Sequence, residues 1–506
     1  MSLAVQLAAQ AEETFRGPTI DYHALAPEII LTVTIVVLVL LDSIKLDRAR
    51  AFMPVVTNLA LLGALIPLLT LAADGGTRVL FGGSYVVGPM PLLLKAMFIV
   101  SAYVVVLLST NYMAEGDYWE SEYYTLLVSS VLGMVVMASS RDLIGIFVAL
   151  ELLSIPAYML ASWRKGDVKS NEAGMKYYLM GVFASAVLLY GMSLVYGLGG
   201  STQLEQIGRS IAEAPSEGVP VITLALLFVV VGFAFKVSAV PFHVWAPDTY
   251  EGAPTPVTAF LAVASKAAGF VALISVVFYA FLPRADIVEP LFFVLAIASM
   301  TVGNLVALRQ TNVVRMLAYS GIAQAGFMLA PFVVAGSDPF EAMQSVVIYL
   351  VIYAAMNLGA FAVIIAIARK TRSAELKDLG GIVHTMPGMA WCMVLFLASL
   401  IGIPPLGGWY AKFGVFKVLI GADTGLGWAT AIIMALNTAV AAYYYLNVAK
   451  TMIFDDAPDG DTTPAPRVPP ALTAAVAITL VATFAFGVLP GLLTNVTAYG
   501  PIALGG

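Results

Sequence analysis

Long apolar stretches separated by short polar breaks run along almost the whole chain. Fourteen of them approach the roughly 20 apolar residues that a helix needs to cross a bilayer core about 30 Å thick. They lie near residues 25–42, 51–73, 90–110, 121–140, 141–163, 173–197, 218–246, 253–281, 288–308, 311–335, 340–368, 386–420, 425–450 and 469–492. This pattern predicts an all-α polytopic membrane protein with about 14 transmembrane helices and both termini on one side.

The composition agrees with a membrane protein and excludes several other classes. Of the 506 residues, 60% are hydrophobic and 11% are charged, which is too few charged residues for a soluble domain. The formal net charge of −6 and the lack of a basic run argue against nucleic-acid binding. A single cysteine, Cys392, excludes a disulfide framework or a thiolate-held iron–sulfur cluster, and no metal-ligand spacing occurs.

The loop cations predict the orientation of the chain. Fourteen Lys and Arg residues fall in the loops after predicted helices 1, 5, 9, 11 and 13, whereas five fall on the opposite side. Cytoplasmic loops carry the excess of positive charge in membrane proteins. We therefore expect a multi-pass protein of a bacterial inner membrane with both termini periplasmic.

Some ionisable residues fall inside the predicted spans, where a charge costs roughly 2.5–3.5 kcal/mol. Lys95, Lys176 and Lys417 lie near span ends, so we expect their long stems to reach the interface.

Four others lie near the middles of their spans: Glu151, Lys236, Lys266 and Lys412. They are too costly to face lipid and should face a protein interior or a hydrated cavity. An architectural alternative is a buried ion pair between Glu151 and Lys236, but such a pair leaves two further lysines unexplained. We therefore predict that these residues transfer protons, which requires burial to lower a lysine pKa and a nearby carboxylate to tune it.

Two predicted helices contain breaks beside these lysines. Pro241 follows Lys236 in predicted helix 7, and Pro404 and Pro405, with nearby glycines, precede Lys412 in predicted helix 12. Interrupted helices at corresponding places in two halves are typical of transporters. His243, after the first break, is a candidate relay between Lys236 and Lys266.

The breaks also suggest the domain organisation. We predict three N-terminal helices (1–120), a five-helix repeat (121–285), an inverted five-helix repeat (286–452), and a cytoplasmic loop with helix 14 (453–506).

The stretch from 236 to 261, KVSAVPFHVWAPDTYEGAPTPVTAFL, followed by Ala264-Ser265-Lys266, closely resembles the proton-conducting membrane subunits of respiratory complex I and of multi-subunit cation/proton antiporters. The stretch from Glu151 to Leu160, ELLSIPAYML, resembles helix 5 of the same family. Lys412, where M-type members carry glutamate, and the lack of the long lateral helix of L-type members resemble the N-type members.

The resemblance implies roles for the residues that match. Glu151 and Lys236 would be the helix 5–helix 7 pair, Lys266 the helix 8 relay and Lys412 the terminal site toward the periplasm. Such a subunit of a proton-pumping NADH:quinone oxidoreductase carries no cofactor. Flavin, iron–sulfur clusters and the quinone site belong to partner subunits, and the other expected partners are protons and the lipid bilayer.

Two other functions remain open. A subunit of a cation/proton antiporter shares the motif and would lack redox partners. A catalytically silent assembly scaffold would use the buried charges only to fasten helices.

Overall fold

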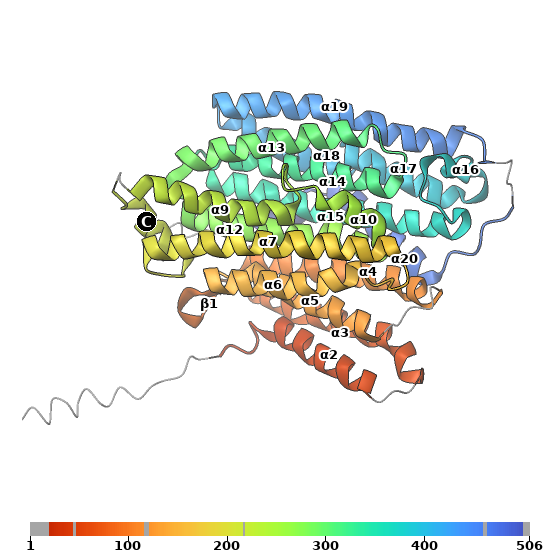
Figure 1. Cartoon of the computed structure of the whole chain (residues 1–506), viewed down its shortest axis with the longest axis horizontal. Helices are drawn as coiled ribbons and strands as arrows, with labels where there is room; N and C mark the ends of the chain where they lie inside the picture. Colours follow the sequence, from red (N-terminus) through yellow and green to blue (C-terminus); the bar gives the residue numbers. More distant parts are fainter. Residues whose placement is uncertain (1–19, 44–46, 116–120, 216–217, 459–462, 499–506) are drawn as a thin grey trace, which may run out of the picture.

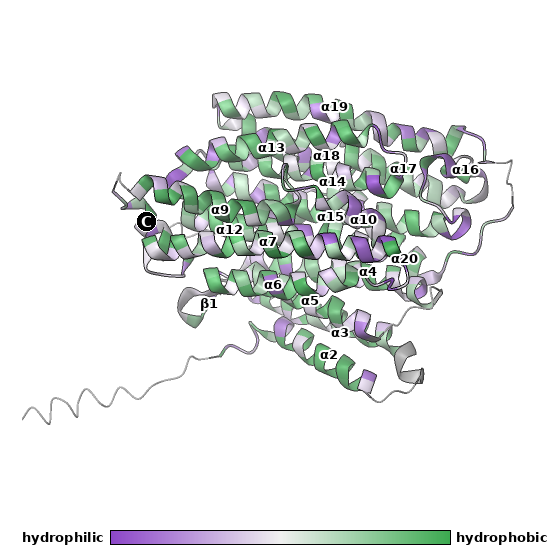
Figure 2. Ribbon diagram, in the orientation of Figure 1, coloured by the Kyte–Doolittle hydropathy of each residue, from purple (hydrophilic) through white to green (hydrophobic). Residues whose placement is uncertain are grey.

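The computed structural model describes residues 20–43, 47–115, 121–215, 218–458 and 463–498. Its long helices lie side by side, with their axes along one direction of the molecule (Figure 1). Apolar residues run along most of their length (Figure 2). The predicted class, an all-helical polytopic membrane protein, is confirmed.

Within the described residues, twelve helical segments are long and apolar enough to cross a membrane. Ten of them each lie within a single helix: α2 (Ala26–Ser43), α3 (Asp47–Asp74), α4 (Pro89–Glu115), α5 (Ser121–Ser139), α6 (Leu143–Ala161), α7 (Val168–Gly199), α9 (Val219–Val237), α15 (Pro339–Thr371), α19 (Gly425–Phe454) and α20 (Pro470–Val488). The other two are a 22-residue segment formed by α14 (Val313–Leu329) and the 3-10 turn Ala330–Val334, and the 53-residue segment Thr255–Ala307.

The count differs from the expected fourteen for two physical reasons. Thr255–Ala307 would be about 80 Å long as one straight helix, more than twice the bilayer core. A 3-10 turn at Leu282–Arg284 divides it before α13 (Ala285–Ala307). Predicted helix 12 is split into α17 (Pro387–Ile401) and α18 (Gly407–Gly421), each of 15 residues and too short to be counted as a span.

The centre of the bundle is built from the segment 255–281 together with α14 and α15. This segment comprises α11 (Thr255–Phe260), a π-helical turn (Leu261–Ser265), α12 (Lys266–Val276) and a second π-helical turn (Val277–Phe281). Every residue of α12 is buried, whereas only 28% of the α2 window is. A helix that is apolar and buried on all sides belongs to the core of a large protein, so α12 is central and α2 peripheral.

Both predicted helix breaks are present. α9 ends at Val237 and the chain resumes as α10 (Trp245–Gly252), while α17 ends at Ile401 and resumes as α18. Each helix ends at a residue in the left-handed conformation, Ser238 (φ 60°) and Gly402 (φ 100°). The two breaks therefore share a local geometry, and the inverted repeats and the four domain boundaries stay predictions.

Two small features were not predicted. A hairpin of β1 (Arg78–Leu80) and β2 (Tyr85–Val87) precedes α4, and the short helix α8 (Leu204–Ala212) follows α7. The hairpin is linked to the turn that precedes α2, because Arg78 Nη1 donates to Asp21 Oδ2 at 2.9 Å. Hydrogen bonds from the Ala24 amide and Arg78 lower the pKa of the Asp21 carboxyl. The remaining short helices are α16 (Ile382–Thr385) and α21 (Gly491–Ala498).

Candidate functional site

Lys236 lies in the last turn of α9, directly before the first break, and is 3% exposed. Its Nζ donates to Ser154 Oγ on α6 at 2.8 Å and to the Tyr177 hydroxyl on α7 at 3.1 Å. The Tyr177 ring stacks on Trp245 of α10 with ring centroids 4.4 Å apart. The ammonium group is therefore held by neutral oxygens from two helices, and an aromatic pair fixes one of them.

The ion pair that the architectural alternative requires is not formed: among the described residues, no oxygen of the Glu151 carboxylate comes within 4.0 Å of Lys236 Nζ. Its Oε1 instead accepts a 2.6 Å hydrogen bond from Ser185 Oγ on α7. Different hydroxyl groups hydrogen-bond to the carboxylate and to the amine, so the two charged groups need no direct contact. Ser154, which accepts from Lys236, lies one turn after Glu151 on α6, so the carboxylate and the amine belong to neighbouring turns of the same region.

Lys266 begins α12, directly after the π-helical turn Leu261–Ser265, and is 1% exposed. Its Nζ donates to the Gly321 carbonyl oxygen on α14 at 2.8 Å. A Cβ atom at Gly321 would lie 3.0 Å from this Nζ and 3.1 Å from the Tyr353 hydroxyl on α15. Glycine therefore gives the amine room to approach the α14 backbone.

Lys412 lies in α18, after the second break, and is 5% exposed. Its Nζ donates to the Ile401 carbonyl oxygen at 2.9 Å and lies 4.7 Å from the centroid of the Phe327 ring. The last carbonyls of a helix have no partner within the helix. The break in predicted helix 12 therefore supplies the acceptor that holds Lys412.

Packing connects Lys236 to Lys266. Gly269 lies one turn after Lys266 on α12, and a Cβ atom there would lie 3.0 Å from Lys236 Cγ. The stem of Lys236 thus lies directly against the helix that carries Lys266.

A group of uncharged polar residues connects Lys266 to Lys412. Ser320, next to Gly321, hydrogen-bonds to the Tyr445 hydroxyl on α19. Gln324, one turn further on α14, accepts from the Tyr349 hydroxyl at 2.5 Å and donates to the Leu400 carbonyl oxygen at 3.2 Å. Leu400 adjoins Ile401, the acceptor of Lys412, so hydrogen bonds and adjacent residues link the two lysines.

The sequence reasoning missed this polar group because it searched the spans for charges. A usable signal exists in α15, where Tyr349, Tyr353 and Asn357 recur every four residues and share one helical face. Asn357 Nδ2 donates to the Tyr353 hydroxyl at 3.0 Å.

His243 lies in the first break and makes no side-chain hydrogen bond to Lys236 or Lys266 in the part of the chain described. Its Nδ1 is buried without a hydrogen-bond partner. Its relay role stays a prediction.

The expectation for the span-end lysines is wrong for Lys95. This side chain is 0% exposed, and its Nζ lies 2.7 Å from Glu28 Oε1 of α2. The Tyr85 hydroxyl donates to the same oxygen at 2.6 Å. An opposite charge is within reach, which explains why Lys95 stays buried, whereas Lys176 and Lys417 are 42% and 61% exposed.

A second charged group, also missed, joins α7, α10 and α14. Asp248 of α10 accepts from Lys176 at 2.7 Å and from Arg315 at 2.8 Å, and Arg315 also donates to Glu251 at 2.9 Å. Asp248 and Glu251 belong to the motif after the first break, so the motif positions this ion-pair network as well as Lys236.

The comparisons with known proteins agree with this geometry. The family model described as NADH:quinone oxidoreductase/Mrp antiporter matches residues 140–438. The chain is 42% identical over 428 residues, 84% of its length and 88% of the relative's, to the NADH-quinone oxidoreductase subunit N of Moorella thermoacetica. It is 37% identical to the subunit of the same name from Trichlorobacter lovleyi, covering 94% of this chain and 95% of the relative.

Solved structures give the same result. A chain of respiratory complex I from Thermus thermophilus matches with a TM-score of 0.78 and 34% identity, over 94% of this chain and all of that one. A chain of the Mrp complex from Dietzia sp. matches with a TM-score of 0.83 and 19% identity, over 95% and 97%, which shows a shared fold. The resemblance drawn from the helix 7–8 motif is thus confirmed, and the chain belongs to the NADH:quinone oxidoreductase/Mrp antiporter family of membrane subunits.

Proposed function

We propose that this chain is the N-type subunit of a proton-pumping NADH:quinone oxidoreductase and conducts protons along Glu151, Lys236, Lys266 and Lys412, with His243 as a relay. The observation that carries the proposal is the burial of three lysines whose amines are bonded only to neutral oxygens. When a lysine paired with a carboxylate loses its proton, the carboxylate remains as an unpaired buried charge. The three lysines here have neutral partners, so their deprotonation leaves no such charge and costs less free energy.

Electrostatic repulsion supports transfer between the linked sites. Two unit charges about 10 Å apart interact by about 1.7 kcal/mol at an effective dielectric constant of about 20. A proton that arrives at one lysine therefore favours release from the next. Motion of Glu151 toward or away from Ser154 and Lys236 would start this sequence.

The proposal extends to the surroundings of the chain. Partner subunits would hold the flavin, the iron–sulfur clusters and the quinone, and quinone reduction there would drive proton movement from cytoplasm to periplasm. The excess of loop cations on one side supports periplasmic termini in a bacterial inner membrane.

The direct test replaces Lys236 with Ala, and separately with the size-matched Met, in the assembled complex. Inverted membrane vesicles report quinone reduction and proton uptake together. We expect proton-coupled quinone reduction to be abolished or greatly reduced in both variants. Lys450→Met is the matched control because this lysine is 63% exposed. A Lys236→Ala enzyme that reduces quinone and pumps at the normal rate would refute the proposal.

Two measurements separate the alternative functions. Co-purification with flavin- and iron–sulfur-bearing subunits supports the oxidoreductase, and their absence supports an antiporter. Replacing Glu151 and Lys236 together with apolar residues of similar size should leave a scaffold unaffected, whereas a proton conductor would stop working.

A further inference from the structure

The short helix α10 packs against α7 and α14, and each of these two helices carries an acceptor of a buried lysine (Figure 1). On α7, the Tyr177 hydroxyl accepts from Lys236. On α14, the Gly321 carbonyl oxygen accepts from Lys266. α7 and α14 have few contacts with each other. The way in which α10 is joined to its two neighbours therefore helps to set the relative position of the two acceptors.

One carboxylate of α10 bonds to both neighbouring helices. Asp248 Oδ2 accepts from Lys176 Nζ of α7 at 2.7 Å, and Asp248 Oδ1 accepts from Arg315 Nη1 of α14 at 2.8 Å. Glu251, one turn later on α10, accepts from the same Arg315 nitrogen at 2.9 Å. Asp248 therefore joins α7 to α14 through α10, and Glu251 strengthens the α14 side.

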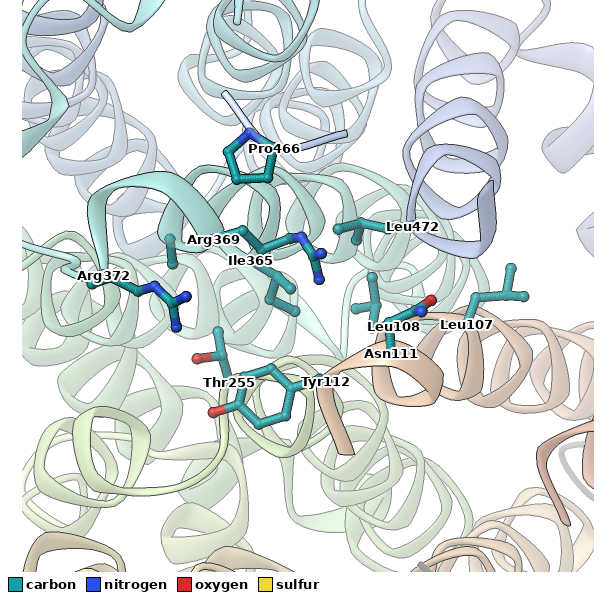
Figure 3. A pocket seen from close by; sticks show the side chains of 11 residues that line it. Leu107, Leu108, Asn111, Tyr112, Thr255, Ile365, Arg369, Arg372, Pro466 and Leu472 are labelled. Atoms are coloured by element: carbon teal, nitrogen blue, oxygen red, sulfur yellow. The ribbon is translucent and has the colours of Figure 1, made fainter. Parts of the chain in front are cut away.

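The charges around α10 balance one another within one group. Three cations and three carboxylates line a cavity of about 150 Å³: Lys169, Lys176, Arg315, Glu172, Asp248 and Glu251. Each of these cations lies within 3.8 Å of at least one of the carboxylates. The cavity of about 550 Å³ in Figure 3 differs, since two arginines line it together with uncharged side chains. The group at α10 is therefore an ion-pair network that joins helices and leaves no excess charge for a ligand.

On the α7 side, this network adjoins the partners of Lys236. Lys176 directly precedes Tyr177, whose hydroxyl accepts from Lys236 at 3.1 Å. Trp245, one turn before Asp248 on α10, stacks on the same tyrosine ring with centroids 4.4 Å apart. Asp248 and Trp245 therefore hold α10 against two adjacent residues of α7.

On the α14 side, the network connects to the acceptor of Lys266 along one helix. Arg315 lies six residues before Gly321, a rise of about 9 Å. The helix is continuous between them. A displacement of Arg315 would therefore move the Gly321 carbonyl oxygen as well.

We propose that Asp248 is a positioning residue: by joining α7 to α14 through α10, it holds the acceptors of Lys236 and Lys266 in the relative positions that proton transfer requires. This inference rests on the proposed function. Asp248 itself transfers no proton, because a cation on each side favours its charged form.

The network is better suited to positioning than to stabilising the fold. The Asp248 and Arg315 side chains are 34% and 30% exposed, and ion pairs that reach solvent add little to stability. A variant that lacks the Asp248 charge should therefore fold and assemble. Its effect should appear at the lysines, because a misplacement of about 1 Å is enough to slow a transfer step.

The first test removes the charge of Asp248 and keeps its size. Asp248→Asn is introduced into the assembled complex, and inverted membrane vesicles report proton uptake. We expect normal assembly and a fall in proton uptake of at least about fivefold, because the acceptors of both lysines shift. Glu205→Gln is the matched control, since it breaks an exposed ion pair with Arg209 on α8 and should leave proton uptake unchanged. Normal proton uptake in Asp248→Asn would overturn the inference.

Two variants of Arg315 apply the test from α14, and they also serve if Asp248→Asn assembles poorly. Arg315→Lys keeps the charge that Asp248 and Glu251 bind, whereas Arg315→Met removes it. We expect proton uptake within about twofold of the wild type in Arg315→Lys and a fall of at least about fivefold in Arg315→Met. Equal proton uptake in the two variants would overturn the inference, because the ion pair would then have no part in the effect.

A density map of the Asp248→Asn complex separates this inference from the proposed function. We expect the Tyr177 hydroxyl or the Gly321 carbonyl oxygen to lie about 1 Å or more from its wild-type position. If neither acceptor has moved, the inference about Asp248 fails and the lysine route stands. If the acceptors have moved and proton uptake is normal, the role of Asp248 in proton transfer is overturned together with the lysine route.

Discussion

The four buried lysines in the described part of the chain lie in two regions, and the partners of their amines differ between the two regions. In the N-terminal region, Lys95 lies 2.7 Å from the Glu28 carboxylate. In the centre of the bundle, Lys266 and Lys412 donate to backbone carbonyl oxygens and Lys236 to two hydroxyl groups. A carboxylate fixes the charge of its lysine, whereas a neutral acceptor leaves that charge free to change. We therefore expect the type of partner, rather than burial alone, to distinguish a proton carrier from a structural lysine.

We expect the largest effect from breaking the N-terminal ion pair between Lys95 and Glu28. Lys95→Met leaves Glu28 buried beside Tyr85 without its opposite charge, so we expect a loss of about 3–5 kcal/mol in the free energy of unfolding. Denaturant titration of the purified subunit measures it. Adding Glu28→Gln to the same chain should recover most of the loss. A single variant that loses less than about 1 kcal/mol would contradict a fixed pair.

The next effect concerns the centre. Lys266→Met leaves only the Gly321 carbonyl oxygen without its donor, a cost of about 1–3 kcal/mol, so the subunit should still assemble. Proton uptake in inverted vesicles should nevertheless fall at least about tenfold, or about 1.4 kcal/mol in barrier. Normal proton uptake would place Lys266 with Lys95 as a structural residue.

A smaller effect is expected from crowding Lys266 without removing it. In Gly321→Ala, the new methyl group meets Lys266 Nζ and the Tyr353 hydroxyl at 3.0–3.1 Å, so the amine must move by a few tenths of an ångström. We expect proton uptake to fall about threefold, or about 0.65 kcal/mol. Gly414→Ala is the control, because a Cβ atom there would meet no neighbouring group within 4 Å in the described part of the chain. Equal rates for the two variants would show that the Lys266 position is not critical.

We expect the smallest effect from removing one of the two acceptors of Lys236. Tyr177→Phe deletes the hydroxyl 3.1 Å from Lys236 Nζ but keeps the ring on Trp245 and the bond to Ser154. A net hydrogen bond is worth about 0.5–1.5 kcal/mol. Because Ser154 still holds the amine, we expect the lower end of this range, a fall of about twofold in proton uptake. A complete loss would mean that Tyr177 itself transfers the proton.

The sequence predicts the parts of this site that depend on local pattern. A proline disrupts the helical hydrogen bonds around it, and prolines stand beside both Lys236 and Lys412, so these breaks could be placed before any packing was known. Proline alone is not decisive, because Pro156 and Pro290 lie inside the continuous helices α6 and α13. The lengths of the apolar stretches likewise identify most of the spans, but they do not show that predicted helix 12 is split into α17 and α18.

Contacts between distant segments could not be predicted in the same way. Glu28 and Lys95 are 67 positions apart, and their meeting depends on how α2 and α4 rotate about their axes when they pack. The sequence leaves an ion pair between Glu151 and Lys236 open as an alternative, yet Ser154, Tyr177 and Ser185 hydrogen-bond to the two groups instead, and a hydroxyl is too common in a sequence to signal this role. The Gln324 group joins α14 to three other helices, α15, α17 and α19, through uncharged polar groups, which a search for charges passes over.

The π-helical turn Leu261–Ser265 has a consequence for how α12 tolerates change. Such a turn holds one residue more than an α-helical turn, and each residue rotates a helix by about 100°. The wider turn takes up the extra residue, so the residues after it keep the direction that a regular helix one residue shorter would give them. Deleting one residue inside Leu261–Ser265 should therefore leave the amine of Lys266 directed at α14, whereas deleting one residue from the regular helix α11 would rotate it by about 100°.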